Sequence, residues 1–205
     1  MKPLFKGPVL ITGGSSRLGM ALALALREEG ARPLSVCRTE EGLARCAEAG
    51  LCGLGEPESL PERCLERMGE PPAHVADLMH SRFESLVAAA PPEAIMEWAA
   101  VDIGLRARFV RAVGRSMLAR RFGRCVFVSS SAAECPAQGQ GYYAAAKLAG
   151  EALYRSLAVE LSGRGVTACS LRLSWLDAGR GAAAATPWML LAAAGSSEVN
   201  RLAAE

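Results

Sequence analysis

The segment TGGSSRLG, residues 12–19, constrains the fold of this chain more than any other stretch. It follows the apolar run PVLIT at 8–12 and precedes an amphipathic stretch from Leu18 to Glu29, with Gly30 as a stop signal. A buried strand, a glycine-rich turn and a helix in this order favour a turn whose backbone N–H groups cradle phosphate. Arg17 stands where another glycine is expected, so the turn is either a working phosphate-binding loop or a decayed one.

Apolar runs of strand length alternate with longer segments of helical period along the chain, which is typical of a parallel sheet covered on both faces. Further strands are predicted at 32–37, 50–54, 73–79, 124–131 and 165–176, and helices at 40–49, after Pro57, at 92–121 and at 142–161. The length of 205 residues and the 51% hydrophobic content suit a single core. We therefore predict one α/β domain over residues 1–205, a Rossmann-type doubly wound parallel sheet between two helical layers.

Charge and cysteine content exclude several classes of protein. The net charge of +2, with scattered arginines, is too small for a nucleic-acid-binding surface. The seven cysteines form no CxxC pair and are odd in number, which indicates reduced thiols. There is no uninterrupted apolar run of about 18 residues and no signal-peptide core. We predict a cytoplasmic protein without nucleic-acid or membrane partners.

Tyr143 and Lys147 are the clearest candidates for chemistry. They are four residues apart on a predicted helix, so they share a face, whereas Tyr142 points about 140° away from the lysine. Three lysines, at 2, 6 and 147, stand against twenty arginines, so the interior lysine is exceptional in this chain. An ammonium beside a phenol stabilises the phenolate and suits proton donation to an oxygen that gains charge. The alternative is a chance pairing on an exposed helix face.

The glycine-rich turn, a strand ending in serines at 129–131 and the Tyr143–Lys147 helix resemble, in order and spacing, the short-chain dehydrogenase/reductase family. The resemblance extends from about residue 8 to about residue 178. It implies that Ser130, thirteen residues before Tyr143, holds the substrate carbonyl, that Tyr143 is the acid/base and that Lys147 also binds the nicotinamide ribose. The alternative for Ser130 is a strand-end cap, as expected for Ser129 and Ser131.

The resemblance also implies a dinucleotide, and the sequence favours NADP(H) over NAD(H). Cys37 stands where NAD-dependent folds place an acidic residue, and the basic Arg38 follows it. The turn pattern T-G-x-x-x-R-x-G resembles that of the NADPH-dependent pteridine reductases and dihydromonapterin reductase-like members, alongside FabG-like members of the family. The residues predicted to bind the cofactor are Gly13, Ser15, Ser16, Arg17, Leu18, Gly19, Arg38, Thr39, Tyr143 and Lys147.

Several positions depart from the family pattern. The sequence HVADLMH, which contains Asp77, replaces the usual Asn-Asn-Ala-Gly, and Gly104 aligns near the asparagine of the proton relay, for which Asp102 is a possible substitute. Leu173-Ser174 replaces a Pro-Gly pair. The sequence ends after an alanine-rich tail that starts at Ala182, which implies a shortened C-terminus and a reduced substrate lid.

Two histidines, His74 and His80, flank the predicted strand at 73–79. No carboxylate or cysteine accompanies them at ligand spacing, so no metal site is predicted. Two readings of His80, with Ser81 and Arg82, remain open: it faces the active-site cleft or it lies in a surface loop.

Two functions follow from these observations. The first is an NADPH-dependent oxidoreductase that reduces a carbonyl or imine of a small molecule, such as a pterin, or of a carrier-bound acyl group. A basic face formed by Arg106, Arg108, Arg111 and Arg115 would suit an acidic carrier protein, but a solvated or dimer-facing helix is the simpler interpretation of these arginines and the one we favour. The second is a non-catalytic nucleotide-binding sensor or partner subunit of an active relative. The resemblance also implies a homodimer or homotetramer.

Overall fold

The computed structural model of the chain describes residues 5–54, 59–81 and 83–173. Within these residues, parallel strands form one sheet in the order β3-β2-β1-β4-β5-β6. The strands are β1 (Pro8–Thr12), β2 (Arg32–Val36), β3 (Cys52–Leu54), β4 (His74–Asp77), β5 (Gly123–Ser130) and β6 (Val166–Leu173). The direction of winding reverses between β1 and β4, and sheets of this kind bind ligands outside the carboxyl ends of the strands at that point.

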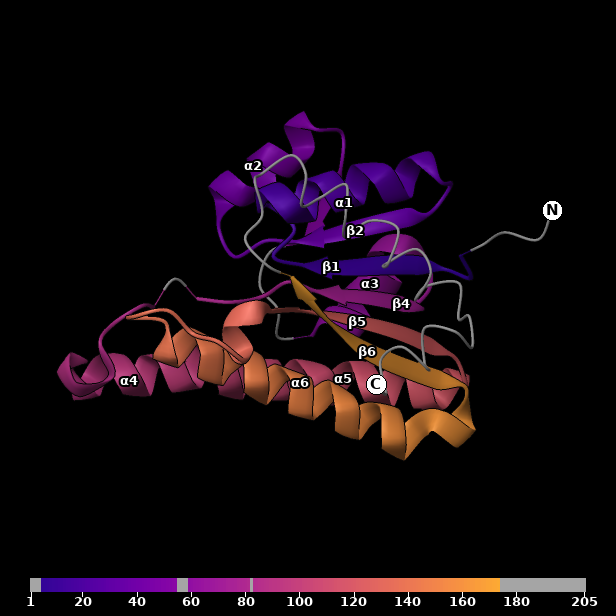
Figure 1. Cartoon of the computed structure of the whole chain (residues 1–205). Coiled ribbons are helices and arrows are strands. Elements are labelled where there is room, and N and C mark those ends of the chain that lie inside the picture. The colour runs from indigo at the N-terminus through magenta and orange to yellow at the C-terminus, as the bar shows by residue number, and fades with distance from the viewer. Residues whose placement is uncertain (1–4, 55–58, 82, 174–205) are drawn as a thin grey trace.

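Helices cover both faces of the sheet (Figure 1). They are α1 (Arg17–Glu28), α2 (Glu40–Glu48), α3 (Leu60–Met68), α4 (Pro92–Trp98), α5 (Arg106–Arg120) and α6 (Gly141–Leu161). Alternate residues of a strand point to opposite faces. Val9 and Ile11 of β1 pack with Leu22 of α1, whereas Leu10 packs in a second cluster with residues of α3, α5 and α6. The predicted three-layer α/β/α fold is therefore confirmed.

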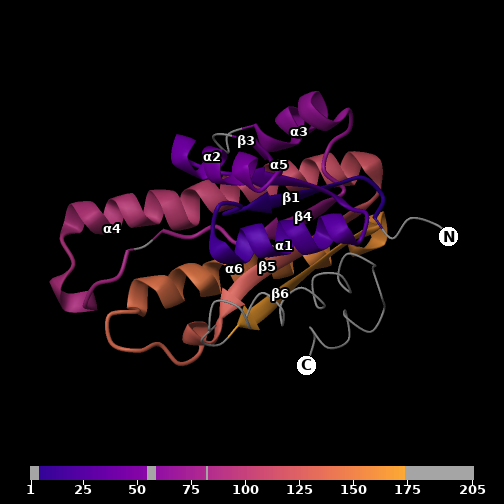
Figure 2. The same cartoon turned by 90° about the horizontal axis from the view of Figure 1, so that it is seen from above.

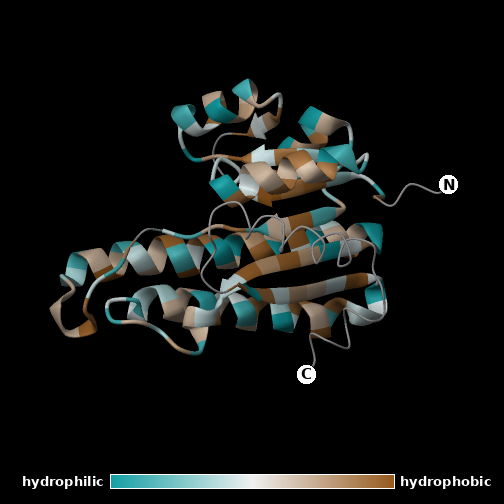
Figure 3. Ribbon diagram, turned by 45° about the horizontal axis from the view of Figure 1, so that its top comes forward, coloured by the Kyte–Doolittle hydropathy of each residue, from teal (hydrophilic) through white to brown (hydrophobic). Residues whose placement is uncertain are grey.

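The hydrophobic residues are concentrated in the strands, and polar residues line the outward sides of the helices (Figure 3). No helix in the described part of the chain has the length and apolar character needed to cross a membrane. All seven cysteines are free thiols.

The predicted helix at 92–121 consists of α4, a π-helical segment at Ala99–Leu105 and α5. A π-helical segment widens the helix by one residue per turn and often lies at a functional site. In Figures 1 and 2, α4 and the first turns of α6 extend beyond the sheet on the side where the strands end. These helices therefore border the carboxyl edge of the sheet.

Other predicted elements differ mainly in their bounds. The strand predicted at 73–79 is shorter, because the chain leaves the ladder after Asp77, whose carboxylate accepts a hydrogen bond from the backbone of Met79. The strand predicted at 165–176 is present as β6, and residues 174–176 lie outside the described residues. The alanine-rich tail lies outside them as well.

Candidate active site

Tyr143 and Lys147 lie one turn apart near the start of α6. The Lys147 ammonium is 5.5 Å from the centroid of the Tyr143 ring. The neighbouring Tyr142 faces elsewhere, because its hydroxyl donates a hydrogen bond to the Val87 carbonyl. The structure thus brings together the two residues that the sequence pairs, at the end of the molecule where the strands terminate.

Lys147 is almost fully buried, with 2% of its surface exposed. Its ammonium donates a hydrogen bond of 2.8 Å to the Val128 carbonyl of β5, which fastens α6 to the end of that strand. Burial and, next in size, the charge of Arg106 lower the pKa of Lys147 to about 8, against the opposing effects of Asp77 and Asp102. The side chain is therefore mostly protonated at neutral pH and close to its titration range.

Ser130 is the last residue of β5 and is half-buried. Its hydroxyl oxygen accepts a hydrogen bond of 3.2 Å from the Ala132 N–H, so it caps the short 3-10 turn at Ser131–Ala133. This contact uses an oxygen lone pair and leaves the hydroxyl hydrogen available to donate. Ser129, in contrast, is buried and donates to Glu151 at 2.6 Å, and Ser131 is exposed.

Asp77, at the end of β4, is fully buried and surrounded by donors. One carboxylate oxygen accepts from the Thr12 hydroxyl at 2.6 Å and from the Met79 N–H at 2.9 Å. The other accepts from the Tyr154 hydroxyl at 3.0 Å and lies 3.4 Å from Nε of Arg106. Asp77 therefore holds the glycine-rich turn, β4 and α6 together through one carboxylate.

Arg106 corrects one prediction from the sequence. The sequence predicts it on a basic helix face with Arg108, Arg111 and Arg115, but its side chain is completely buried. The helical period indicates that Arg106 is buried, because it lies three, four and seven residues before the buried Phe109, Val110 and Val113 and so shares their face of α5. We call Asp77, Asp102, Arg106 and Lys147, each at most 2% exposed, the buried charge cluster.

Asp102 and Gly104 both lie in the π-helical segment. Gly104 has no side chain to contribute, and a Cβ there would approach the Ala99 carbonyl oxygen no closer than 3.7 Å. The Asp102 carboxylate accepts hydrogen bonds from the Ser81 N–H, at 2.7 Å, and from the Ser81 hydroxyl. Asp102 therefore ties the chain that follows β4 to the π-helical segment.

His80 lies beside Tyr143, with ring centroids 5.8 Å apart and ring planes at 82°. Its Nδ1 is 2.6 Å from the Ser81 carbonyl oxygen, so the neutral ring carries its hydrogen on Nδ1. Of the two readings left open by the sequence, this contact favours the position next to the candidate site, although the His80 side chain is exposed. Arg82 lies outside the described residues.

The glycine-rich turn has close backbone contacts at each of its three glycines. Gly13 has a φ of +64°, which favours glycine. A Cβ at Gly14 would lie 2.6 Å from the Cβ of Ser35, and a Cβ at Gly19 would lie 2.5 Å from the Gly13 carbonyl oxygen. The turn therefore requires glycine at these positions, and it keeps this tight packing although position 17 is an arginine.

The start of α1 follows this turn directly. The Ser16 hydroxyl caps the helix by accepting from the Gly19 N–H at 3.0 Å, and the first turn contains no acidic residue. Arg17 is exposed and Leu18 is half-buried against the core cluster that contains Leu22. The positive end of a helix beside an exposed arginine suits a phosphate group.

The end of β2 lies next to the same turn. Arg38 and Thr39 are exposed, and the Thr39 hydroxyl caps α2 by accepting from the Gly42 N–H at 3.1 Å. A Cβ at Gly42 would lie 2.8 Å from the Ser15 hydroxyl, so α2 begins against the glycine-rich turn. Cys37 is buried with its sulfur 3.4 Å from that of Cys46, and burial raises the pKa of the Cys37 thiol to about 11.

These residues fit a dinucleotide along the carboxyl edge of the sheet. The glycines and the cap of α1 suit the pyrophosphate, and Arg38 and Thr39 stand at the strand end used for the adenosine ribose. Tyr143 and Lys147 lie beyond β4 and β5, on the other side of the point where the winding reverses.

Comparisons with known proteins bear on the family and the fold. The family model described as short chain dehydrogenase matches residues 87–183. The 3-oxoacyl-(acyl-carrier-protein) reductase FabG of Escherichia coli is 29% identical over 174 residues, which cover 80% of this chain and 71% of that protein. FabG of Pseudomonas aeruginosa is 27% identical over 181 residues, with 82% and 73% covered.

Among solved structures, NAD+-bound xylitol dehydrogenase superposes with a TM-score of 0.75 at 20% identity, over 96% of this chain and 80% of that one. At this identity the likeness concerns the fold alone. The family match over residues 87–183 and the similarity to FabG reductases lead to one conclusion: the chain is similar to the short-chain dehydrogenase/reductase family of oxidoreductases.

Proposed function

We propose that the chain is an NADPH-dependent reductase that converts a carbonyl, or an imine, of a small molecule or a carrier-bound acyl group. The similarity to short-chain dehydrogenases and FabG reductases supports a nicotinamide cofactor. The observation that carries the proposal is the buried Lys147 ammonium beside the Tyr143 ring at the end of β5, with Ser130 at the tip of that strand.

In this proposal the bound cofactor supplies a hydride to the carbonyl carbon. Tyr143 gives its phenolic proton to the oxygen that gains charge, so the C=O group becomes CH–OH and the phenol becomes a phenolate. Ser130 donates a hydrogen bond to the same oxygen. Lys147 stabilises the phenolate by its charge and binds the nicotinamide ribose with the N–H groups not directed at Val128.

Arg38 and Arg17 support NADPH over NADH in this proposal. Both are exposed next to the surface proposed for the dinucleotide, and Cys37 leaves the end of β2 without a carboxylate. A guanidinium at this position accommodates a 2′-phosphate, whereas an acidic residue would repel it.

The proposed substrate class rests on the names of the relatives and on the sequence of the glycine-rich turn. FabG proteins are named for reduction of 3-oxoacyl groups on acyl carrier protein, which supports an acyl substrate. Arg106 is buried and does not belong to the basic face of α5. The exposed Arg108, Arg111 and Arg115 are still compatible with an acidic carrier. A pterin is the specific small-molecule alternative suggested by Arg17. A cytoplasmic location remains a prediction.

Assembly into a homodimer or homotetramer belongs to the same proposal. A groove between α5 and α6 is lined by apolar residues, with Arg111 and Arg115 on one side and Glu160 on the other. A two-fold interface uses the same patch of both copies, and a patch that carries arginines on one side and a glutamate on the other can pair with itself in this way.

The test is to titrate the protein with NADPH while nicotinamide fluorescence is followed, and then to add 3-oxoacyl thioesters, ketones, quinones and pterins. We expect NADPH to bind and at least one substrate to be reduced. Tyr143→Phe should lose at least about 100-fold in turnover, because general acid catalysis is removed, while it still binds NADPH.

Failure of this test has two distinct forms. Binding of NADPH without any Tyr143-dependent oxidation would reject the reductase and favour the nucleotide-binding sensor or partner subunit. Absence of NADPH binding would reject both the reaction and the cofactor.

A further inference from the structure

Arg106 makes an unusual set of contacts for a side chain with no exposed surface. Its guanidinium donates to the carbonyl of Met79, after β4, and to those of Asp102 and Ala146, in the π-helical segment and α6. It also pairs with Asp77 at 3.4 Å. A planar guanidinium with five N–H donors can serve all of these partners at once, which a lysine cannot.

Arg106 also shares an environment with Lys147. The Ala146 carbonyl, which accepts from Arg106 at 3.4 Å, belongs to the residue next to Lys147. Both cations approach the ring of Phe127, at 5.1 Å for Arg106 and 5.2 Å for Lys147. Two buried like charges therefore face one aromatic ring, and the buried Asp77 and Asp102 supply the compensating charge.

We propose that Arg106 is a positioning residue for Lys147: it clamps the Lys147 turn of α6 to the end of β4 and places a second positive charge next to the ammonium. The inference rests on the proposed function for its use in catalysis, since Lys147 is the residue that serves the cofactor and Tyr143. The clamp connects the segment after β4, the π-helical segment and α6, which are three of the segments that border the candidate site.

Electrostatics agree with this assignment. After burial, the charge of Arg106 is the largest cause of the lowered pKa of Lys147, and Asp77 and Asp102 act in the opposite direction with smaller effects. Removal of the guanidinium charge should therefore strengthen proton binding by Lys147. Removal of both the Arg106 and the Asp77 charges should also raise the pKa of Lys147, but by less, because the two charges act in opposite directions.

The experiment is a pH titration of the Lys147 side chain by NMR in the full chain with ¹³C-labelled lysine. The chain has three lysines, so three side-chain signals are expected, and Lys147→Arg identifies the one that belongs to Lys147. The variants are Arg106→Met, Arg106→Lys and the double variant Asp77→Asn/Arg106→Met. The double variant leaves no unpaired carboxylate at position 77, so it still allows the titration if the single Met variant fails to fold.

We expect the titration midpoint of Lys147 to rise by roughly half a pH unit or more in Arg106→Met. It should rise less in the double variant and stay near that of the unmodified chain in Arg106→Lys. Midpoints in the folded Met variants that coincide with that of the unmodified chain would overturn the electrostatic part of the proposal.

NADPH binding tests the clamp. Arg106→Lys keeps the charge but loses most of the carbonyl contacts, so we expect up to about tenfold weaker binding. Unchanged binding by this variant would overturn the clamp. If the unmodified chain binds no NADPH, the proposed function fails, whereas the Lys147 titration, which needs no cofactor, still decides the role of Arg106.

Discussion

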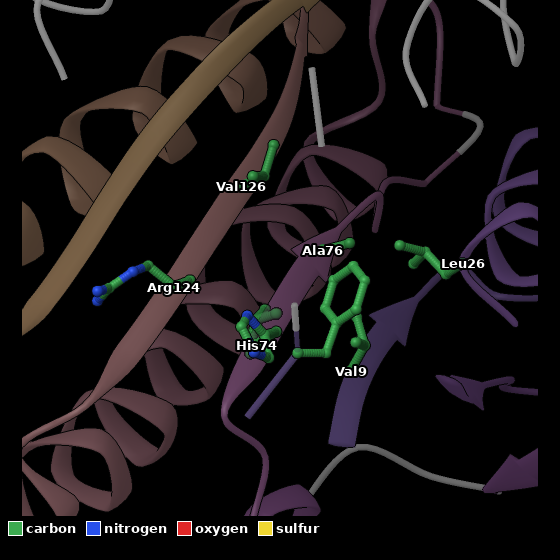
Figure 4. Close-up of a pocket in the computed structure, with 8 residues that line it drawn as sticks. Val9, Leu26, His74, Ala76, Arg124 and Val126 are labelled. Atoms are coloured by element: carbon green, nitrogen blue, oxygen red, sulfur yellow. The ribbon is translucent and has the colours of Figure 1, made fainter. Parts of the chain in front are cut away.

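His74 is a histidine that the fold keeps uncharged. It is 2% exposed in β4, and its ring lies edge-on between those of Phe5 and Phe122. Its Nε2 accepts from the Lys6 N–H at 3.3 Å, and its Nδ1 has no hydrogen-bond partner among the described residues. Figure 4 shows it beside a small cavity, with the Arg124 side chain directed away from it. Burial and the charges of Arg124 and Arg120 lower the pKa of His74 to about 4.

This arrangement predicts a loss of stability in mild acid. In the unfolded chain the imidazole takes a proton below about pH 6.5, whereas in the folded chain it does so only near pH 4. The free energy of unfolding should therefore be unaffected by His74 above about pH 6.5 and decrease by up to about 3 kcal/mol as the pH falls to about 4. Urea unfolding at a series of pH values measures this change.

His74→Gln is the matched variant, because an amide oxygen can still accept from the Lys6 N–H. We expect its stability to decrease less between pH 7 and pH 4 than that of the unmodified chain. Parallel stability curves for the two proteins would show that His74 does not carry the effect.

Arg38 leads to a prediction about cofactor choice. Arg38→Asp places a carboxylate where NAD-dependent folds bind the ribose hydroxyls, so it should weaken NADPH binding by about tenfold or more and improve the relative binding of NADH. Fluorescence titrations with both cofactors measure the ratio. Arg164→Asp makes the same charge change just before β6, at the amino end of the sheet, and should leave the ratio unchanged.

At the scale of residues, the sequence identified the Tyr143–Lys147 pair but not the environment that surrounds it. The pair was predictable because a four-residue spacing on a helix places two side chains on one face. The buried state of Arg106 depends on Asp77, Met79 and Ala146, which lie far from it in sequence. The spacing of buried residues within the helix indicates that Arg106 faces the interior, but only the three-dimensional structure shows which residues it contacts.

Among the elements, the glycine-rich turn gives the sharpest prediction. Gly19→Ala would place a Cβ 2.5 Å from the Gly13 carbonyl oxygen and 2.9 Å from the Cα of Gly14, so the turn and α1 must separate. We expect a loss of about 1–3 kcal/mol in the free energy of unfolding and much weaker NADPH binding. Chemical denaturation and cofactor titration measure the two effects.

Gly163→Ala is the control, because a Cβ there meets nothing within 4 Å. It should leave both quantities unchanged to within about 0.5 kcal/mol. Equal losses of stability and of NADPH binding in the two variants would mean that the tight approach of α1 to the glycine-rich turn contributes to neither.

The order and type of the elements were predictable because their signals are local, but two features were not. The strand at 73–79 is cut to four residues by the side-chain contacts of Asp77, which no periodicity encodes. The π-helical segment at Ala99–Leu105 was read as ordinary helix, because hydrophobic spacing does not distinguish a single widened turn within a long helix.

For the molecule as a whole, the sheet order follows from the doubly wound class, since strand–helix–strand units with one handedness leave few ways to arrange such strands. This order brings the glycine-rich turn after β1, the chain after β4 and the end of β5 to one edge. Segments more than 100 residues apart in sequence, Gly13 and Ser130 among them, thereby border one site.

Assembly gives the prediction at the largest scale. If the groove between α5 and α6 forms the proposed two-fold interface, a charge inside it must be buried against the partner's apolar residues. Leu118 lines this groove and is 38% exposed, so Leu118→Arg should shift the chain from dimer or tetramer toward monomer. Light scattering after size-exclusion chromatography, over a range of protein concentrations, measures the mass in solution.

Leu65→Arg is the matched control for this experiment, because Leu65 of α3 is 47% exposed and does not line the groove. An oligomer that survives Leu118→Arg, or one that Leu65→Arg disrupts equally, would place the interface elsewhere. A monomeric unmodified chain would reject the proposed assembly. In that case the exposed Arg111 and Arg115 would be available to an acidic carrier protein. The double variant Arg111→Glu/Arg115→Glu should then lose NADPH oxidation with a carrier-bound substrate.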